Sequence, residues 1–386
     1  MSRPTRTVPV ALLPLAFCCA TAASAAPAPD FAVLHAFSGP DGACPIGRLT
    51  TGPRAGLYGT TLAGGTHNDG TVFRLLPDGR VQTLHHFNRH VDGVAPTGVI
   101  LGSDGNLYGT TFGRAGQSSI PGIVFRLAPD GAFTVLHQFD WGVGSNPVVQ
   151  GSDGALYGTT NQGPGTVYRL ALEGGYTVLH AFGEDFFDEH GPIGALAEGP
   201  PGVFYGVTSY GGPTSSGSLY QVGADGSFSF VHVFGGGSDG SMPFGGPIVA
   251  ADGTVQGTTM YGGPLNNGTV YGWSPAGQGG TLRAFAGSGR QGFFPEAGPT
   301  ADTRGTLYGT TTRYREGADL NTAGTVFGLA NGKLRVLHVF ASDGSEGNAD
   351  GSPLVALADT SLVGVACSGG AGGAGTVFQV SPVPQP

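Results

Sequence analysis

The chain has 386 residues, a net charge of −9 and only 11% charged residues. This acidic balance argues against nucleic acid as a partner, because its binding requires a surface rich in Lys and Arg. A hydrophobic content of 39% is enough for a folded core, and the 73 glycines fall at fixed turn positions, which argues against a disordered chain.

The N-terminal segment, residues 1–25, is predicted to be an export signal. It has two arginines near its start, an apolar stretch over residues 8–23 and the small residues Ala23-Ser24-Ala25, which fit a cleavage site. A membrane anchor is the alternative, and it is disfavoured because the apolar stretch is short and ends in the cleavage motif. We therefore expect a secreted protein, periplasmic or extracellular, whose mature part is residues 26–386.

The mature chain repeats three short phrases, each of them seven times. They are variants of Leu-Tyr-Gly-Thr-Thr, Gly-Thr-Val-Phe and Leu-His-x-Phe. All three are rich in β-branched and aromatic residues and are bounded by Gly, Pro, Asp or Asn, as strands are. Copies of the first phrase, including degraded forms, begin at Leu57, Leu107, Leu156, Phe204, Val255, Leu307 and Leu362. Their spacing of about 50 residues is typical of four-stranded propeller blades, which bury their faces only against neighbouring blades.

One repeat shows how the four strands of a blade follow one another. The predicted strands are residues 96–101, 107–111, 124–127 and 133–139, from the centre of the ring to its rim. Asp-Gly or Asn-Gly before many second and fourth strands predicts tight hairpins, since these dipeptides accept the positive φ of type I′ turns. No stretch has helical periodicity. The predicted fold is all-β: a single seven-bladed β-propeller with a short Pro-rich tail.

The two ends of the repeat array are out of phase, and this predicts how the ring closes. The mature chain opens with an orphan outer strand, residues 31–37, while its last strand, residues 377–380, is a third strand with no fourth behind it. An open array would leave both as unpaired edges. We therefore predict that the first strand completes the last blade.

Removal of the signal leaves two cysteines, Cys44 and Cys367. Cys44 is expected in the first connection from an outer to an inner strand, and Cys367 between the second and third strands of the last blade. In a propeller these connections emerge on the same face, and ring closure brings the two together. In an exported, oxidising setting we predict a disulfide; two unpaired buried thiols are the alternative.

Together the three phrases resemble the Gloeo/Verruco tandem repeat, called GloVer, of exported bacterial proteins. The matching text in the first repeat is Leu57-Tyr58-Gly59-Thr60-Thr61, Gly64-Gly65, Gly70-Thr71-Val72-Phe73 and Leu84-His85-His86-Phe87. The resemblance covers nearly all of the chain after the signal. It implies a secreted or surface protein, but no reaction and no catalytic residues. Members carry varied C-terminal anchors, whereas none is expected here. The double glycine also resembles kelch blades, although the kelch tryptophan is missing.

The repeated polar residues are expected to serve the fold. The histidines of the third phrase lie on outermost strands around the rim, so packing or hydrogen bonding is favoured over metal binding. They are His35, His85, His137, His180, His232 and His338. Asp-Gly pairs recur in the connections between blades, at Asp41, Asp92, Asp239 and Asp350. Ca²⁺ needs several oxygens and each copy offers one carboxylate, so turn chemistry is favoured. The sequence therefore predicts no metal and no cofactor.

Irregular positions are better candidates for a binding site, because the fold does not dictate them. The two most irregular connections contain Asp185, Asp188, His190, Arg313, Tyr314 and Arg315. Other candidates on the same face are Arg89, His90, Trp141, Arg290, Phe293 and Phe294. Long loops on a rigid scaffold offer many side chains to a ligand, whereas tight turns offer few. We predict ligand contact on the face with the long loops; ordinary solvated loops are the alternative.

Two function classes remain open. The first is a secreted, monomeric binding or surface-interaction module whose partner is a glycan or an extracellular protein. The second is a hydrolase or lyase acting on polysaccharides, with Asp185 or Asp188 as acid and base. The sequence has no Ser/His/Asp elbow, phosphate loop or zinc spacing. Propellers host many activities, so the fold alone does not choose between the two classes.

Overall fold

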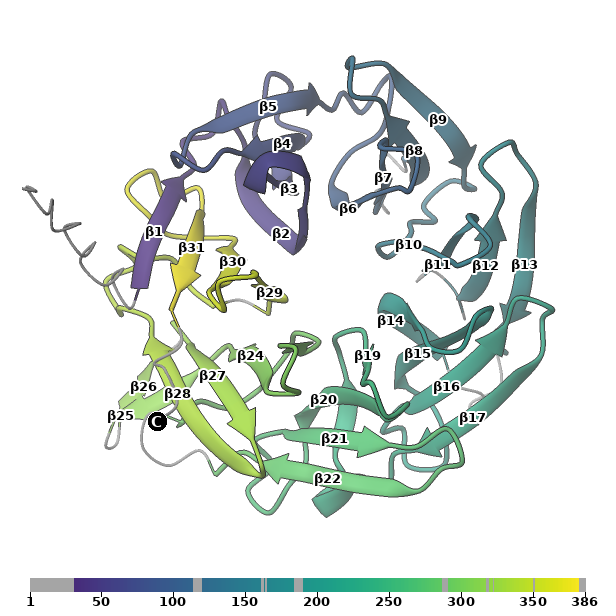
Figure 1. The fold of residues 1–386 in the computed structure, drawn as a ribbon, viewed down its shortest axis with the longest axis vertical. Helices are drawn as coiled ribbons and strands as arrows, with labels where there is room; N and C mark the ends of the chain where they lie inside the picture. Colours follow the sequence, from purple (N-terminus) through teal and green to yellow (C-terminus); the bar gives the residue numbers. More distant parts are fainter. Residues whose placement is uncertain are drawn as a thin grey trace, which may run out of the picture.

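A computed structural model describes residues 31–113, 120–160, 163, 165–183, 190–286, 291–316, 319–321, 323–349 and 351–381. Seven antiparallel sheets follow one another around a ring (Figure 1), which confirms the predicted seven-bladed β-propeller. Each blade is four strands deep, and the inner strand of one blade is split into two segments. Within these ranges no helix is long and apolar enough to cross a lipid bilayer.

Blades are numbered here from the N-terminus by their inner strands. Blade 1 consists of β2 (Ala43–Thr51), β3 (Leu57–Ala63), β4 (Thr71–Leu75) and β5 (Val81–His86). Blade 2 consists of β6 (Pro96–Leu101), β7 (Leu107–Thr111), β8 (Ile123–Leu127) and β9 (Phe133–Gln138). Blade 3 consists of β10 (Val149–Gln150), β11 (Leu156–Thr160), β12 (Thr166–Leu170) and β13 (Tyr176–Ala181). The strand boundaries predicted for blade 2 agree with these to within one residue.

The remaining blades repeat the same order. Blade 4 consists of β14 (His190–Glu198), β15 (Val203–Tyr210), β16 (Ser218–Gly223) and β17 (Phe228–Val233). Blade 5 consists of β18 (Ser241–Pro243), β19 (Ile248–Val249), β20 (Val255–Tyr261), β21 (Thr269–Trp273) and β22 (Gly279–Ala284). Blade 6 consists of β23 (Thr300–Ala301), β24 (Leu307–Thr311), β27 (Thr325–Ala330) and β28 (Lys333–Val339). Blade 7 consists of β29 (Val355–Ala356), β30 (Leu362–Ala366), β31 (Thr376–Val380) and β1 (Phe31–Ala36). Outside the blades lie a hairpin and two 3-10 turns, namely β25 (Tyr314–Glu316), β26 (Asp319–Asn321), η1 (Pro53–Ala55) and η2 (Gly237–Asp239).

The N-terminal strand closes the ring, as the phase of the repeats predicts. β1 pairs antiparallel with β31, with Phe31 opposite Val380, and the two lie side by side in Figure 1. The same segment contacts both neighbouring blades. The ring of Phe31 stacks on His338 of blade 6 at 3.8 Å, and Phe37, which is fully buried, meets Phe73 of blade 1 at 5.2 Å. The two ends of the chain therefore share blade 7.

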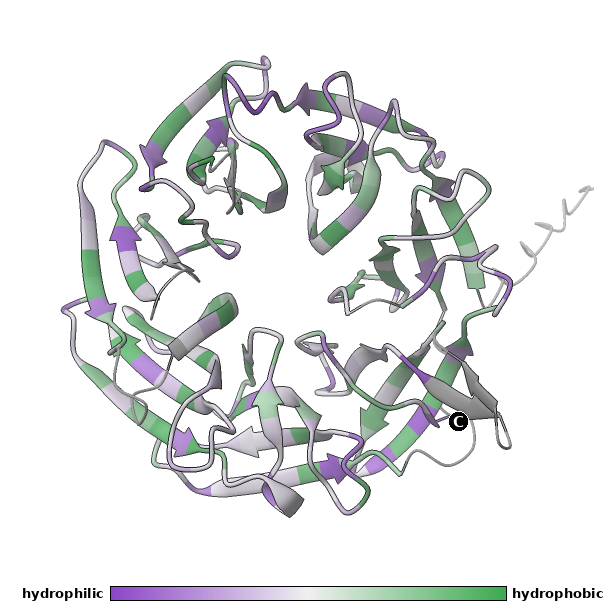
Figure 2. Ribbon diagram, turned by 180° about the vertical axis from the view of Figure 1, so that it is seen from behind, coloured by the Kyte–Doolittle hydropathy of each residue, from purple (hydrophilic) through white to green (hydrophobic). Residues whose placement is uncertain are grey.

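The core lies between blades rather than at one centre. Among the described residues, seven hydrophobic clusters occur, one at each junction of adjacent blades. The junction of blades 1 and 2, for example, joins Phe87 to Leu107 and Phe125. Figure 2 shows hydrophobic segments along the strands of every blade. Because each blade is stabilised by its neighbours, an open ring would lose one whole junction.

The repeated phrases encode contacts within each blade. In Leu-Tyr-Gly-Thr-Thr, the glycine allows an aromatic ring of the third strand to lie on the second: a Cβ at Gly109 would come within 2.5 Å of Phe125. The last threonine closes the adjacent loop, since Thr61 Oγ1 accepts a hydrogen bond from the Thr71 N–H at 3.1 Å. The same hydroxyl pairing recurs in blades 3, 4, 5 and 6. These threonines therefore stabilise strand ends.

Every outer strand carries a β-bulge at the Leu-His pair. In blade 1 the register skips Leu84, because Thr83 and His85 face consecutive residues of β4. Leu84 and Phe87 are three residues apart and would point to opposite faces of a regular strand, yet both contribute to the cluster between blades 1 and 2. The same shift occurs in all seven blades. In blade 1 the bulge thus directs both Leu84 and Phe87 toward blade 2.

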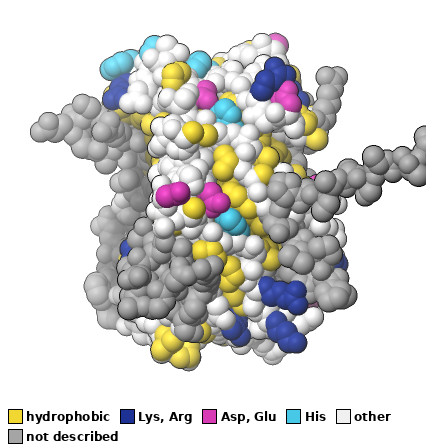
Figure 3. Space-filling model, turned by 90° about the vertical axis from the view of Figure 1, so that its left-hand side faces the viewer, with side chains coloured by type: hydrophobic (Ala, Val, Ile, Leu, Met, Phe, Trp, Pro, Cys, Tyr) yellow, Lys and Arg dark blue, Asp and Glu magenta, His cyan; other side chains and the backbone are white. Residues whose placement is uncertain are grey.

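The repeated histidines join neighbouring blades. His85 stacks on Phe133 of blade 2 at 4.2 Å, and its Nε2 lies 2.8 Å from Asp92 Oδ2. Equivalent stacks are His137 on Tyr176, His180 on Phe228, His232 on Trp273 and His338 on Phe31. Equivalent carboxylate partners are Asp41, Asp239 and Glu346. Figure 3 shows the rim of the ring, with histidines beside small spots of acidic side chains. These contacts support the packing interpretation of the histidines and the turn interpretation of Asp41, Asp92 and Asp239, while Asp350 lies outside the described residues.

The predicted partners Cys44 and Cys367 are joined by a disulfide. Cys367 directly follows β30 of blade 7, as expected. Cys44 lies within β2 rather than in a loop, because that strand begins early and pairs Ala43 with Ala63. The bond therefore links blade 7 to blade 1 across the junction where the ring closes.

Candidate functional site

The two faces of the ring differ in their connections. The connections between blades, and those from second to third strands, emerge on one face, which we call the loop face. The connections from first to second and from third to fourth strands form the opposite face, which we call the turn face. In blade 2 the loop-face connection is residues 112–122, whereas the turn-face connections are only residues 102–106 and 128–132. The binding residues predicted from the sequence belong to the loop face, as far as the structure describes them.

A hollow of about 580 Å³ opens on the loop face where the connection from blade 1 meets blade 2. It brings together three residues that the sequence singled out, Arg89, His90 and Trp141. We call it the loop-face hollow. Its principal lining side chains are Arg89, His90, Val91, Val135, Gln138 and Trp141.

One ion pair holds the edge of the loop-face hollow. The backbone N–H of Arg89 donates to Asp69 Oδ2 at 2.8 Å, and the side-chain Nε of Arg89 donates to Asp69 Oδ1 at 2.8 Å. Asp69 is only 1% exposed. Burial alone would raise the pKa of its carboxyl, but the hydrogen bonds and charge of Arg89 outweigh burial and hold that pKa below its usual value. Arg89 is therefore an anchor of the loop.

A second carboxylate fixes the floor of the loop-face hollow. Asp92 Oδ1 accepts a hydrogen bond from the Asn88 N–H at 2.7 Å, and Asp92 Oδ2 lies 2.8 Å from His85 Nε2. Both oxygens are thus engaged by the repeated turn and histidine contacts. Asp92 supports the shape of the hollow and is poorly placed to act as an acid or base.

The most exposed side chains around the hollow are apolar. Trp141 is 74% exposed and Val91 is 77% exposed. The polar side chains of His90 and Gln138 are also exposed. A large aromatic face beside polar groups suits a ligand that has a flat apolar side and hydroxyls around its edge.

The residues predicted as the centre of the site lie in different blades. His190 begins β14 of blade 4. Arg313 forms a β-bridge with Phe293, and Tyr314 and Arg315 belong to β25, in the connection between β24 and β27 of blade 6. Blade 5 separates these two groups. Three predicted positions lie outside the described residues, namely Asp185, Asp188 and Arg290.

A smaller polar cluster surrounds Arg313. Its guanidinium lies 5.5 Å from the ring centroid of Phe294, which in turn meets the Tyr261 ring at 5.1 Å. Thr312 Oγ1 donates to Glu296 Oε1 at 3.3 Å. Burial raises the pKa of the Glu296 carboxyl, although the Thr312 hydrogen bond and the Arg313 charge act in the opposite direction. A carboxyl with a raised pKa is a candidate general acid.

Sequence reasoning missed Asp69, Val91 and Glu296. A signal for two of them exists in the comparison of repeats. Glu296 stands after Pro295 where blade 2 has the neutral Thr97 after its proline. Asp69 stands before its glycine where blade 5 has the neutral Asn267. Val91 gives no such signal, because its exposure depends on how two blades meet.

Each of the seven blades carries the repeated phrases, and the N-terminal strand closes the ring. The protein is therefore a repeat protein that forms a single propeller. The family model of the Gloeobacter/Verrucomicrobia repeat matches residues 21–199 and 192–385. The chain therefore belongs to this family, as its three phrases indicate. A search of curated proteins finds no match.

Solved structures with a similar fold include two lyases. Virginiamycin B lyase from Staphylococcus aureus aligns with a TM-score of 0.63 and 11% identity, over 92% of this chain and 98% of that one. A streptogramin B lyase aligns with a TM-score of 0.62 and 13% identity, over 92% and 97%. At such identities the likeness shows the fold alone.

Proposed function

We propose that this chain is an exported glycan-binding module that holds a sugar chain in the loop-face hollow. The observation that carries the proposal is the exposed indole of Trp141 beside Val91 at a hollow of about 580 Å³. Exposed apolar side chains gathered on rigid loops mark interaction sites. A sugar ring offers a C–H face to the indole and hydroxyls to His90 and Gln138.

A glycan suits this surface better than a protein partner does. Stable protein interfaces bury about 800 Å² on each partner, whereas the exposed apolar residues here gather around one hollow. Its volume falls within the roughly 300–1,000 Å³ that is common for sites of small ligands. The nearby charged side chains already have partners, since Arg89 pairs with Asp69 and Asp92 Oδ2 lies 2.8 Å from His85 Nε2.

Export is part of the proposal and rests on residues 1–25, which lie outside the described ranges, and on the disulfide. A disulfide between Cys44 and Cys367 is stable in the periplasm or outside the cell and is rare in a reducing cytosol. We expect the mature chain, residues 26–386, to act there as a monomer.

The alternative function is cleavage of a polysaccharide by a hydrolase or lyase mechanism. The raised pKa of the Glu296 carboxyl beside Arg313 favours this alternative. In that case Glu296 would supply the acid, Asp185 or Asp188 would be the candidate base from the sequence, and substrate contact would extend to the region of His190, Tyr314 and Arg315.

A glycan array with three forms of the mature protein tests the proposal: wild type, Trp141→Ala and Phe230→Ala. Phe230 is the matched control, because it is an aromatic residue 45% exposed on blade 4. Loss of a stacking contact worth about 1.4 kcal/mol weakens binding about tenfold. We expect that loss in Trp141→Ala and unchanged binding in Phe230→Ala.

Two results decide against the proposal. One is a wild-type protein that binds no glycan, and the other is a Trp141→Ala protein that binds as wild type does. Reducing-end release should be measured on the same glycans. Catalytic release would replace the binding function with the hydrolase or lyase alternative.

A further inference from the structure

Sister blades use a carboxylate on the turn face that blade 1 lacks. In blade 3, Asp153 accepts hydrogen bonds from the Tyr157 hydroxyl at 3.0 Å and from Arg169 Nη2 at 2.7 Å. The same tyrosine–carboxylate pair occurs in blades 2 and 6, as Tyr108 with Asp104 at 2.6 Å and Tyr308 with Asp302 at 3.2 Å. The carboxylate thus satisfies the tyrosine of the Leu-Tyr-Gly-Thr-Thr phrase.

In blade 1 the turn has the same form but a different residue. The Gly52 N–H donates to the Gly56 carbonyl at 2.8 Å, as the Gly102 N–H does to the Asn106 carbonyl. This equivalence puts Arg54 at the turn position of Asp104. Blade 1 nevertheless retains the other two partners, because Tyr58 pairs in register with Arg74 as Tyr157 does with Arg169.

Blade 4 also lacks the turn carboxylate, but it lacks the arginine opposite the tyrosine as well. Its turn has Pro201 in place of the aspartate, and there Tyr205 faces the neutral Gln221 across the strands. Blade 1 therefore departs from its sister blades by keeping the charged residue after the carboxylate has gone. A retained guanidinium without its internal carboxylate is free to pair with a carboxylate from outside the chain.

The guanidinium of Arg74 has hydrogen-bond donors that the described residues do not fully use. Its Nε is buried and has no hydrogen-bond partner among the described residues. Its Nη2 makes one long hydrogen bond, of 3.3 Å, to the Pro53 carbonyl, and its guanidinium lies 5.7 Å from the Tyr58 ring centroid. A buried donor without a partner is costly, and the guanidinium fork matches a carboxylate in two parallel hydrogen bonds.

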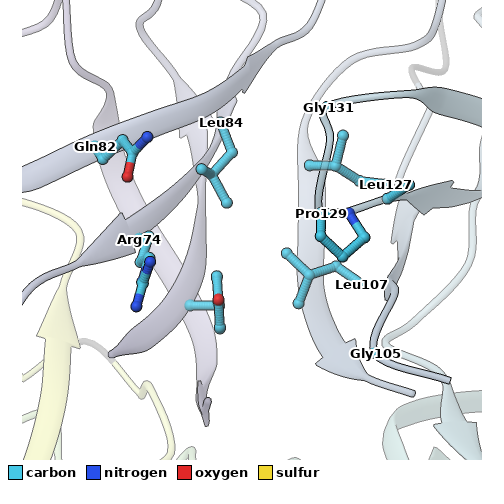
Figure 4. Close-up of a pocket in the computed structure, with 10 residues that line it drawn as sticks. Arg74, Gln82, Leu84, Gly105, Leu107, Leu127, Pro129 and Gly131 are labelled. Atoms are coloured by element: carbon cyan, nitrogen blue, oxygen red, sulfur yellow. The ribbon is translucent and has the colours of Figure 1, made fainter. Parts of the chain in front are cut away.

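A pocket of about 230 Å³ adjoins Arg74 on the turn face, between blades 1 and 2. Figure 4 shows Arg74 and Gln82 on one side and Leu107, Leu127 and Pro129 on the other. The pocket has therefore one cationic, hydrogen-bonding wall and one apolar wall.

The size of the residue that blade 2 contributes also matters for this space. Between blades 3 and 4, the ring of Phe204 stacks on Tyr157 at 3.9 Å. Blade 2 has the smaller Leu107 at the position of Phe204, as most copies of the repeated phrase do. The missing carboxylate and the small size of Leu107 together leave room beside Arg74.

We propose that this turn-face pocket binds a small organic carboxylate, and that a hexuronate is the class that fits it. The ligand carboxylate takes the place of the absent aspartate between Arg74 and Tyr58. Gln82 meets a ring hydroxyl, and the C–H face of the ring lies on Leu107 and Leu127. The pocket is on the opposite face from the loop-face hollow and does not depend on the function proposed for that hollow.

Calorimetric titration of the mature protein tests this assignment with D-galacturonate, with the neutral D-galactose and with inorganic sulfate. We expect galacturonate to bind at least about tenfold more tightly than galactose, because charge-assisted hydrogen bonds are the stronger ones. Trigalacturonate distinguishes the source of the carboxylate. Tighter binding of the trimer indicates the end of a sugar chain, and equal binding indicates a free acid.

Two variants locate the binding. Arg74→Gln should lose at least about tenfold in galacturonate affinity. Arg54→Asp should restore the internal carboxylate, so that it raises the melting temperature and abolishes galacturonate binding. Arg126→Gln, at the equivalent position of blade 2, is the matched control and should bind normally. Trp141→Ala should also bind galacturonate normally, which separates this site from the loop-face hollow.

The assignment is overturned if galacturonate does not bind at about 50 mM, a concentration that detects even weak complexes. It is also overturned if Arg74→Gln and Arg54→Asp both bind it as wild type does. Sulfate binding as tight as that of galacturonate would refute the role of the apolar wall and with it the hexuronate class.

Discussion

Ring closure by the N-terminal strand predicts a specific cost for one substitution, Phe37→Ala. Phe37 and Phe87 are both fully buried, and each meets a phenylalanine of the next blade edge-on, at 5.2 Å and 5.3 Å respectively. Phe87 lies at an internal junction, between blades 1 and 2, whereas Phe37 lies at the junction that closes the ring. Replacing a buried Phe by Ala costs about 3–5 kcal/mol. The two substitutions should therefore destabilise the protein by similar amounts.

Urea unfolding of the mature protein measures both effects, with the Cys44–Cys367 disulfide intact in every sample. A shift of the midpoint at an unchanged slope reports a change in the free energy of unfolding. If Phe37→Ala changes that free energy by less than about 0.5 kcal/mol, as an exposed substitution does, while Phe87→Ala costs the full amount, the closing strand is not docked and the account of the ring is wrong.

Three further predictions concern other contacts. Non-reducing peptide mapping of exported protein should find Cys44 joined to Cys367, with a stabilisation on the order of 4–5 kcal/mol in the chain-entropy model for so long a loop; free thiols in folded, unreduced protein would contradict this. Asp69→Asn should lower the free energy of unfolding at pH 7, and its difference from wild type in urea unfolding should shrink below about pH 4. The reason is that a carboxyl with a depressed pKa stabilises the fold above its unfolded pKa and loses this effect as pH falls through its folded pKa. A difference independent of pH would refute the ion-pair role of Asp69. Arg313→Ala should leave the melting temperature within about 2 °C of wild type, because Arg313 belongs to no repeated phrase; a larger loss would make it a structural residue.

The sequence predicts the architecture well because each blade corresponds to one copy of a repeated sequence. The phase of the first strand, residues 31–37, and of the last phrase is enough to predict the exchange that pairs Phe31 with Val380. The bulge at Leu84 cannot be predicted from the sequence, because the phrase Leu-His-x-Phe is compatible with both a regular and a bulged strand. Its presence follows only from the need to bury both Leu84 and Phe87 on one side of the sheet.

For the candidate sites, too, the sequence predicts some features and only the structure shows the others. Trp141 and His90 stand out as irregular loop residues, but their meeting with Val91 depends on how two blades meet and is not visible in either repeat. The change from Asp104 to Arg54 is visible in an alignment of the blades. Its meaning depends on Arg74, whose buried Nε has no hydrogen-bond partner in the part of the chain that the structure describes. Repeated positions therefore predict structure, while departures from the repeat point to sites whose geometry the structure supplies.

Hydrogen exchange on the mature protein, with and without a neutral glycan that it binds, tests the central claim most directly. Trp141 and Val91 place the ligand on the loop face, so protection is predicted in the connections of residues 87–95 and 139–148, and Trp141→Ala should abolish that protection. Protection confined to the turn-face connections, residues 102–106 and 128–132, would put the glycan on the opposite face and contradict the proposed function.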